Sequence, residues 1–257
     1  IVLTIGSFDG VHSGHQKILK SIISLAKSRE MKSALLTFSP HPRFVLKPKI
    51  DKVFGLITTD KEKTDLLENL GLDHLIIEEF NHEMASTPPE KYIQKLLIQG
   101  IKPNIVVVGF DHKFGKNREG DINLLREFES KGHFEIVEID KQLLKEEKIS
   151  STRVRNLIMQ GDVTTASLLL TRPYSLTGKV VPGEQKGREM GYPTANIQPT
   201  DSQKLYPAKG VYACRVLIDK EVYQGMLNVG YRPTISDNQI KTIEAHIFNF
   251  NKNIYGQ

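Results

Sequence analysis

The stretch IVLTIGSFDGVHSGHQKIL, residues 1–19, decides the fold of the first part of the chain. Four of its first five residues are apolar, and the run predicts a buried strand. The apolar residues after the loop recur at helical spacing and predict a helix over 16–28. Gly6, Gly10 and Gly14 lie between the two and permit a tight loop that a ligand can approach closely. A strand that passes through such a loop into a helix is the opening of a βαβ fold.

The alternation of strand and helix patterns continues to about residue 160. Further strands are expected at 33–40, 73–80, 101–110 and 133–139, and helices at 59–71, 88–100 and 122–132. The strand at 101–110 is so apolar that both of its faces must be covered, as in a parallel sheet between two helix layers. We therefore predict an α/β doubly wound parallel sheet, which binds ligands at the carboxyl ends of its strands.

Helical periodicity disappears after Arg172. The segments that follow are rich in strand formers and are separated by Gly, Pro, Asn and Asp turns, a pattern typical of a small antiparallel β-barrel or sandwich, of which we expect the barrel. We therefore predict two domains, residues 1–171 and residues 172–257.

The composition excludes several classes of protein. The 257 residues carry 35 basic and 30 acidic side chains, and the basic ones are dispersed instead of clustered as a nucleic-acid surface requires. No apolar run approaches the roughly 18 residues of a membrane span. One cysteine, Cys214, excludes an internal disulfide framework, and no basic-then-apolar leader is present. We expect a cytoplasmic protein with no nucleic-acid and no membrane partner.

His12 and His15 are the first candidate functional residues. Their spacing at a helix start places both imidazoles on one side of an N-terminus that favours anions. Two donors there are able to stabilise charge that builds up on a phosphate. A zinc site is less favoured, because no Cys or His follows at suitable spacing, and the loop lacks the Gly-Lys-Ser/Thr ending of a P-loop.

The HxGH loop resembles the signature of the nucleotidyltransferase superfamily, which has a Rossmann-like fold, binds ATP there and transfers an adenylyl group with release of pyrophosphate. The stretch KISSTRVRNLI, residues 148–158, places hydroxyls before a helix that has an arginine one turn from its start. This pattern indicates either a phosphate cradle or a plain N-cap with surface arginines. It resembles the superfamily's second signature. The resemblance implies catalytic roles for His12, His15 and Arg155, and ATP binding by Gly6, Phe8, Asp9, Gly10, Gly14, Ser151 and Thr152.

Two further stretches, LTFSPHPRFVL (36–46) and VVVGFDHKFGKNREGD (106–121), narrow the resemblance. The whole set resembles bacterial bifunctional FAD synthetase, which carries a riboflavin kinase and an FMN adenylyltransferase on one chain. The resemblance implies ATP binding by Asp111 and flavin binding by Phe38, Pro40, His41, Pro42, Phe114 and Arg118. Core packing is the alternative for the two phenylalanines. His112 departs from the family, which usually has an aromatic residue there.

The second site is expected in GEQKGREMGYPTANI, residues 183–197. Glycines four apart let backbone N–H groups wrap a polyphosphate, and a hydroxyl and an amide oxygen are able to reach Mg²⁺. A glycine-rich hairpin loop is the alternative for the glycines alone, but the complete string resembles the riboflavin kinase signature. The resemblance implies nucleotide binding by Gly183, Gly187, Gly191 and Pro193, Mg²⁺ binding by Thr194 and Asn196, and a general base, Glu244, for the riboflavin hydroxyl.

The resemblance therefore implies an enzyme that makes FMN from riboflavin and ATP, and FAD and pyrophosphate from FMN and ATP, with Mg²⁺ as cofactor. Its partners are small-molecule substrates, and we expect a monomer or weak homo-oligomer. Family members continue past the segment that ends this sequence, so we expect the kinase half to be C-terminally incomplete. Two alternatives stay open: a nucleotidyltransferase for another phosphorylated acceptor with a non-catalytic β domain, and a flavin- or nucleotide-binding regulator.

Overall fold

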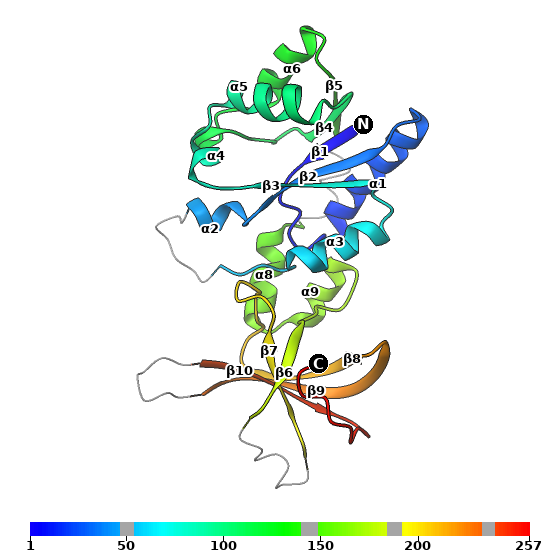
Figure 1. Ribbon diagram of the computed structural model, residues 1–257, viewed down its shortest axis with the longest axis vertical. Helices are drawn as coiled ribbons and strands as arrows, with labels where there is room; N and C mark the ends of the chain where they lie inside the picture. The colour runs from blue at the N-terminus through cyan, green and yellow to red at the C-terminus, as the bar shows by residue number, and fades with distance from the viewer. Residues whose placement is uncertain (47–53, 140–148, 184–191, 233–239) are drawn as a thin grey trace. The chain divides into compact units, whose positions relative to one another are not determined.

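The computed structural model describes residues 1–46, 54–139, 149–183, 192–232 and 240–257, which are drawn in colour in Figure 1. The chain divides into two compact units. One comprises Ile1–Ser151 with Leu169–Thr171, and the other comprises Thr152–Leu168 with Arg172–Gln257. Within the described ranges, no helix is long and apolar enough to cross a membrane.

The first unit is built on a parallel sheet of five strands in the order β3-β2-β1-β4-β5. The strands are β1 (Val2–Ile5), β2 (Ser33–Ser39), β3 (His74–Glu79), β4 (Ile105–Gly109) and β5 (Glu135–Ile139). Because β1 lies between β2 and β4, the direction in which strands are added reverses at β1, and ligands bind at such a point. The predicted doubly wound parallel sheet is confirmed.

Helices cover both faces of this sheet (Figure 1). They are α1 (Ser13–Ser28), α2 (Pro42–Leu46), α3 (Asp60–Asn69), α4 (His82–Ser86), α5 (Pro89–Tyr92), the π-helix η1 (Ile93–Ile101), the 3-10 turn η2 (Lys116–Arg118) and α6 (Ile122–Ser130). Successive residues of a strand point to opposite faces. Leu3 and Leu36 accordingly pack with α5, η1 and α6, whereas Val2 and Leu35 pack with α1 and α3. This burial on both faces explains the continuous apolar strands.

Two helix ends test the predicted boundaries. Gly71 follows α3 in the left-handed region, with φ of +82°, and its N–H bonds to the carbonyl of Glu68, as the prediction of a helix stop there requires. The predicted stop at Gly100 is wrong by one residue. The helix runs to Ile101 because Lys102 takes the left-handed conformation and donates its N–H to the carbonyl of Leu97.

The second unit combines two helices with an antiparallel sheet. The helices are α8 (Ser151–Gln160) and α9 (Val163–Leu170), and the strands are β6 (Gly178–Val181), β7 (Ala195–Pro199), β8 (Gly210–Ile218), β9 (Glu221–Arg232) and β10 (Ile240–Ile247). The order is β6-β7-β10-β9-β8, and every pair is antiparallel. Asp219 and Lys220 join β8 to β9 with positive φ at both positions, as in a type I′ hairpin. The predicted antiparallel β domain is confirmed.

Candidate active sites

Three loops with predicted adenylyltransferase residues leave the same edge of the parallel sheet. Residues 6–12 follow β1, residues 40–46 follow β2, and residues 110–121 follow β4. These three strands are neighbours and run in one direction, so their carboxyl ends meet. The structure therefore brings the three sequence motifs of the first unit to one edge, as predicted.

His12 and His15 form a stacked pair at the start of helix α1. His12 is the N-cap residue, and its Nδ1 accepts a hydrogen bond from the backbone N–H of His15 at 3.3 Å. The two ring centroids lie 3.6 Å apart with planes 17° apart, and the ring of Phe8 packs on His15 at 4.6 Å. The predicted placement of both imidazoles at one helix N-terminus is confirmed, and the helix dipole there favours an anion.

The glycines of this loop make room for the rings. A Cβ at Gly6 would lie 3.0 Å from the ring of Phe8, and one at Gly14 would lie 3.3 Å from Nδ1 of His12. Gly10 has φ of +86°, a conformation that side chains other than glycine rarely adopt.

Asp9 uses its carboxylate to hold a neighbouring segment. Its two oxygens accept hydrogen bonds from the backbone N–H groups of Ile57 and Thr58 and from the Thr58 hydroxyl, at 3.0 to 3.2 Å. The Thr58 oxygen in turn accepts the N–H of Gly10 at 3.0 Å. Asp9 is only 3% exposed, and a buried carboxylate requires such partners. These contacts fix the backbone of the loop, and ATP binding by Asp9 stays a prediction.

The segment after β2 carries a group of flat side chains. The rings of His41 and Phe54 lie 4.9 Å apart, and Phe44 meets His41 edge-on at 6.5 Å. The guanidinium carbon of Arg43 lies 4.7 Å from the centre of the Phe54 ring. Aromatic faces with a cation beside them suit a flat, anionic ligand.

The other predicted flavin residues of this segment lie at the end of β2 and at the start of α2. Phe38 is half-buried at the end of β2 and meets Phe80 edge-on at 5.7 Å. Pro40 is exposed, and Pro42 begins α2.

The loop after β4 is closed by a bridge between Phe114 and Gly120, whose backbone groups exchange hydrogen bonds of 3.1 and 3.0 Å. A Cβ at Gly120 would lie 2.6 Å from the Phe114 ring, so the glycine is required. Phe114 is 7% exposed and packs on Tyr92 with centroids 5.4 Å apart. Its ring therefore belongs to the core in this structure, whereas Asp111 and Arg118 are exposed.

His112 is held in the same loop without a hydrogen-bond partner for its buried Nε2 in the described part of the chain. Its ring stacks near Phe114, with centroids 5.8 Å apart and planes 28° apart. Burial lowers the pKa of His112 to about 4; Asp111 raises it, and Arg118 adds to the lowering. The imidazole is therefore neutral near pH 7.

The predicted phosphate cradle begins helix α8. The Ser151 hydroxyl donates to the backbone carbonyl of Asp9 at 2.9 Å, which joins this residue to the loop of His12. Thr152 is exposed and Arg155 is buried, and both belong to the second compact unit.

Glu244 stands in a row of polar side chains on the antiparallel sheet of the second unit. It lies opposite Asn196 of β7 on one side and opposite Asn228 of β9 on the other. Residues directly opposite each other in an antiparallel pair share a face. Glu244 and Asn196 are half-buried and Asn228 is exposed, so the row is accessible. A carboxylate between two amides is able to accept a proton while the amides bind polar groups of a ligand.

Gly183 is required by Asn196. A Cβ at residue 183 would lie 2.0 Å from Nδ2 of Asn196. Thr194 is half-buried just before β7, and the carbonyl of Pro193 lies 2.8 Å from Nδ1 of His246. The predicted nucleotide-binding residues Gly187 and Gly191 lie outside the described residues.

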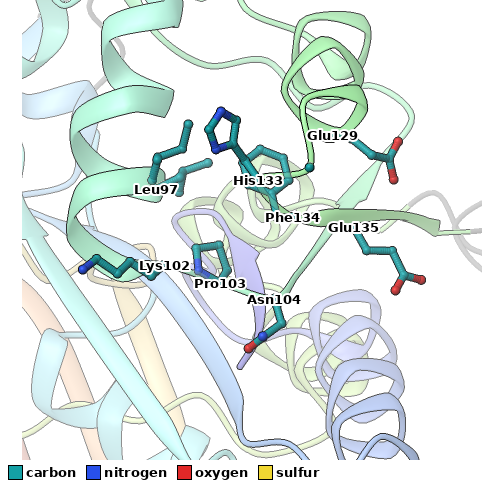
Figure 2. A pocket seen from close by; sticks show the side chains of 10 residues that line it. Leu97, Lys102, Pro103, Asn104, Glu129, His133, Phe134 and Glu135 are labelled. Carbon is teal, nitrogen blue, oxygen red and sulfur yellow. The ribbon is translucent and has the colours of Figure 1, made fainter.

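A pocket of about 700 Å³ lies at the other edge of the parallel sheet, where β4 and β5 begin (Figure 2). Its walls come from residues 97–104 and 129–135, among them Lys102 and His133. None of the predicted site residues lines it. The candidate sites are therefore located by the chemistry of the motif residues and not by this pocket.

A doubly wound sheet with a histidine pair at its reversal point, followed by an antiparallel unit with an accessible carboxylate, defines a two-part nucleotide-dependent transferase. Residues 1–153 match the family model of FAD synthetase, and residues 170–257 match the family model of riboflavin kinase. The chain belongs to the family of bifunctional riboflavin kinases/FMN adenylyltransferases.

Curated relatives with that description support the assignment over the full chain. The protein of Listeria monocytogenes is 36% identical over 256 residues, which are 100% of this chain and 80% of the relative. That of Bacillus subtilis is 36% identical and covers 99% of this chain and 80% of the relative. That of Escherichia coli K12 is 33% identical, with 100% and 80% covered. The alternative of a different acceptor with a non-catalytic β domain is not favoured, because both family models match.

A solved structure has the same fold. The crystal structure described as a macrolide-efflux protein from Streptococcus pneumoniae matches with a TM-score of 0.86 and 32% sequence identity, over 99% of this chain and 82% of the other. That description concerns the other protein. The family models and the curated relatives agree on the flavin enzymes.

Sequence reasoning missed three polar residues at these sites. Thr58 and Lys63 lie beneath the loops of the first unit, and Asn228 extends the row beside Glu244. One signal was available: Lys63 stands four residues before the buried Leu67, on the apolar face of helix α3. A lysine on a buried face is unusual and indicates a specific polar partner.

Proposed function

We propose that this chain phosphorylates riboflavin with ATP to form FMN and then adenylylates FMN with a second ATP to form FAD and pyrophosphate. We assign the adenylyl transfer to residues 1–171 and the phosphorylation to residues 172–257. The observation that carries the proposal is that each unit presents the groups that its own reaction needs. The first has an imidazole pair at a helix N-terminus, and the second has a carboxylate on an accessible strand.

In the adenylyl transfer, a phosphate oxygen of FMN attacks the α-phosphorus of ATP, and the bond from that phosphorus to the bridging oxygen breaks to release pyrophosphate. The nucleophile is already anionic, so the site needs no strong base. His12 and His15 stabilise the charge that builds up on the transferred phosphate. The helix N-terminus of α1 adds its dipole.

The ATP and flavin contacts of this site follow from the loops at the same edge. The flat side chains near His41 suit the flavin ring, with Phe38, Pro40 and Pro42 beside them and Arg118 on the FMN phosphate. Asp111 suits the hydroxyls of a ribose. Because Phe114 is 7% exposed, its contribution is to hold the loop around Gly120 from below.

In the phosphorylation, the riboflavin 5′-hydroxyl attacks the γ-phosphorus of ATP and ADP leaves. An alcohol must lose its proton to attack, so a base is needed here, and Glu244 accepts that proton. Gly183, Gly187, Gly191 and Pro193 bind the nucleotide, and Asn196 and Asn228 flank the base.

Thr194 and Asn196 offer oxygen donors of the kind that Mg²⁺ prefers. No group of three or more His, Cys, Asp or Glu side chains in the described ranges suits a metal, and Mg²⁺ in kinases is held by one or two protein ligands, waters and substrate phosphates. The absence of a side chain at residue 183 leaves the space that the amide of Asn196 fills, and Thr194 adds a hydroxyl oxygen nearby in sequence. Mg²⁺ bound by Thr194 and Asn196 would neutralise charge on the ATP phosphates.

One assay tests the whole proposal. The purified chain is incubated with ATP, Mg²⁺ and either riboflavin or FMN, and the products are separated by chromatography. FMN from riboflavin and FAD from FMN are expected, and both are expected to stop when EDTA removes the metal. A folded protein that forms neither product would overturn the proposal and favour a flavin- or nucleotide-binding regulator.

We also propose that the enzyme works in the cytoplasm on small molecules, as a monomer or weak homo-oligomer without nucleic acid. The single cysteine and the dispersed positive charge support this proposal. Light scattering of the purified chain at two protein concentrations tests the oligomeric state.

A further inference from the structure

Lys63 is a buried lysine beside the adenylyltransferase loops. It lies on helix α3 and is only 5% exposed, although lysine is almost never fully buried unless it is paired. A capping box between Thr59 and Glu62 fixes the start of this helix one turn before it. The ammonium group is therefore held by a rigid element and its position is well defined.

One arm of contacts runs from Lys63 to the loop of the histidine pair. Its Nζ donates to Oγ1 of Thr37 at 3.3 Å. The Thr37 hydroxyl, which is fully buried, donates to the backbone carbonyl of Ser7 at 3.2 Å. Ser7 lies in the loop that leads from β1 to His12.

A second arm runs from Lys63 to the flavin-side segment. Nζ pairs with Oδ1 of Asp60 at 3.2 Å, and Oδ2 of Asp60 accepts the hydroxyl of Ser39 at 2.5 Å. Ser39 directly precedes Pro40 and His41. One buried cation thus connects two of the three loops that meet at the sheet edge.

We propose that Lys63 is a positioning residue for adenylyl transfer, which holds the histidine loop through Thr37 and the FMN-binding segment through Asp60 and Ser39. Hydrogen bonds from a charged donor are stronger than neutral ones, so the two contacts of Lys63 hold both loops in one arrangement before substrate binds. Small misplacements of reacting groups cost large factors in rate. Lys63 is covered by protein and therefore acts through its partners and not by touching substrate. The inference rests on the proposed function of the first unit.

The test replaces Lys63 by methionine in the full chain. Methionine keeps the length and apolar stem of lysine, and Asp60, whose side chain is 47% exposed, stays hydrated when its partner is lost. Removal of one partner of an ion pair destabilises a protein when the other charge is left buried, and Asp60 avoids this because it keeps its hydration and the hydrogen bond from Ser39. We expect kcat for FAD formation to fall about tenfold or more and KM for FMN to rise several-fold. FMN formation from riboflavin is expected to stay unchanged, and the urea midpoint of unfolding is expected not to fall.

Lys61→Met is the matched control. Lys61 lies two residues away on the same helix, is 85% exposed in its side chain and pairs only with Asp65 in the described residues. It is expected to leave both activities and the midpoint unchanged.

Two conservative variants separate the arms. Thr37→Val removes the hydroxyl between Lys63 and Ser7 and is expected to lower kcat alone. Ser39→Ala removes the bond to Asp60 and is expected to raise KM for FMN alone. A combined Lys63→Met/Thr37→Val variant is expected to lose less than the product of the single losses, since both changes break the same arm.

Three outcomes contradict the inference. A folded Lys63→Met variant that forms FAD at nearly the wild-type rate shows that the lysine positions nothing. Parallel loss of both activities with a lower urea midpoint shows a purely structural role. If the wild-type chain itself forms FMN but no FAD, the proposed function of the first unit fails, and the inference fails with it.

Discussion

Glu244 lies directly opposite Asn196 across the β10–β7 pair. In such a pair the two Cβ atoms are about 4.5–5.5 Å apart, which brings a carboxylate and an amide within reach of one small ligand group. The two residues come from segments 48 positions apart, so the fold and not the local sequence creates this arrangement.

Glu244→Gln tests the base. The amide is nearly isosteric but accepts no proton, so FMN formation from riboflavin is expected to fall about 10²–10⁴-fold. FAD formation from supplied FMN, assigned to the other unit, is expected to persist. Steady-state rates for both reactions in one preparation provide the measurement, and loss of both with retained folding would contradict separate sites.

Gly183→Ala tests the space that Asn196 occupies. The added methyl would lie 2.0 Å from Nδ2 of Asn196, so the amide must move. Kinase activity is expected to fall about tenfold or more, as misplacement of a binding group commonly causes, with FAD formation unchanged. Gly210→Ala is the control, because its nearest contact would be an ordinary 3.6 Å. Equal effects of the two substitutions would refute the role of Gly183.

His12 serves as the N-cap of helix α1 as well as a candidate catalytic group, and two substitutions separate these roles. His12→Asn retains a capping side chain, whereas His12→Ala removes the cap at a cost of about 1 kcal/mol in stability. Both are expected to lower FAD formation about 10²–10³-fold by removing the imidazole. Urea unfolding and the FAD assay together decide. An active His12→Asn variant would show that only the cap matters.

His112 gives the stability a pH dependence. Its pKa is lowered from 6.5 to about 4 in the folded protein. Between these two values the imidazole is protonated in the unfolded chain and neutral in the folded protein, so the unfolded state binds more protons. The free energy of unfolding is therefore not reduced by His112 above pH 6.5, and it falls by up to about 3 kcal/mol as the pH falls toward 4.

His112→Phe replaces the imidazole by an aromatic ring that binds no proton. The difference in unfolding free energy between pH 7.5 and pH 5 is expected to be smaller in His112→Phe than in the wild type. Denaturant titrations at the two pH values measure it. An unchanged difference in unfolding free energy between the two pH values in His112→Phe would contradict the assignment.

The sheet, its helices and the histidine loop were predictable because their signals are local. Apolar runs mark strands that are buried on both faces, and a strand, a glycine-rich loop and a helix follow one another within 19 residues. The stacking of His12 on His15 follows from their spacing at a helix start. These features depend little on the rest of the chain.

Contacts between distant segments were not predictable in this way. The carboxylate of Asp9 binds backbone groups 48 and 49 residues away, and no pattern near Asp9 announces Ile57 or Thr58. Periodicity likewise does not tell whether the ring of Phe114 faces a ligand or the core, and the structure packs it against Tyr92. Only the tertiary fold chooses between such alternatives.

Asn196, Glu244 and Asn228 lie side by side only when β7, β10 and β9 pair in the correct register. The kinase chemistry therefore requires that register. A slip of one residue in β10 would turn Glu244 to the opposite face of the sheet. A molecule with the slipped register would form no FMN at all, instead of forming it at a reduced rate. In a preparation refolded from denaturant, the specific activity of FMN formation would therefore count the correctly paired chains, and the Michaelis constant of the active fraction would stay unchanged.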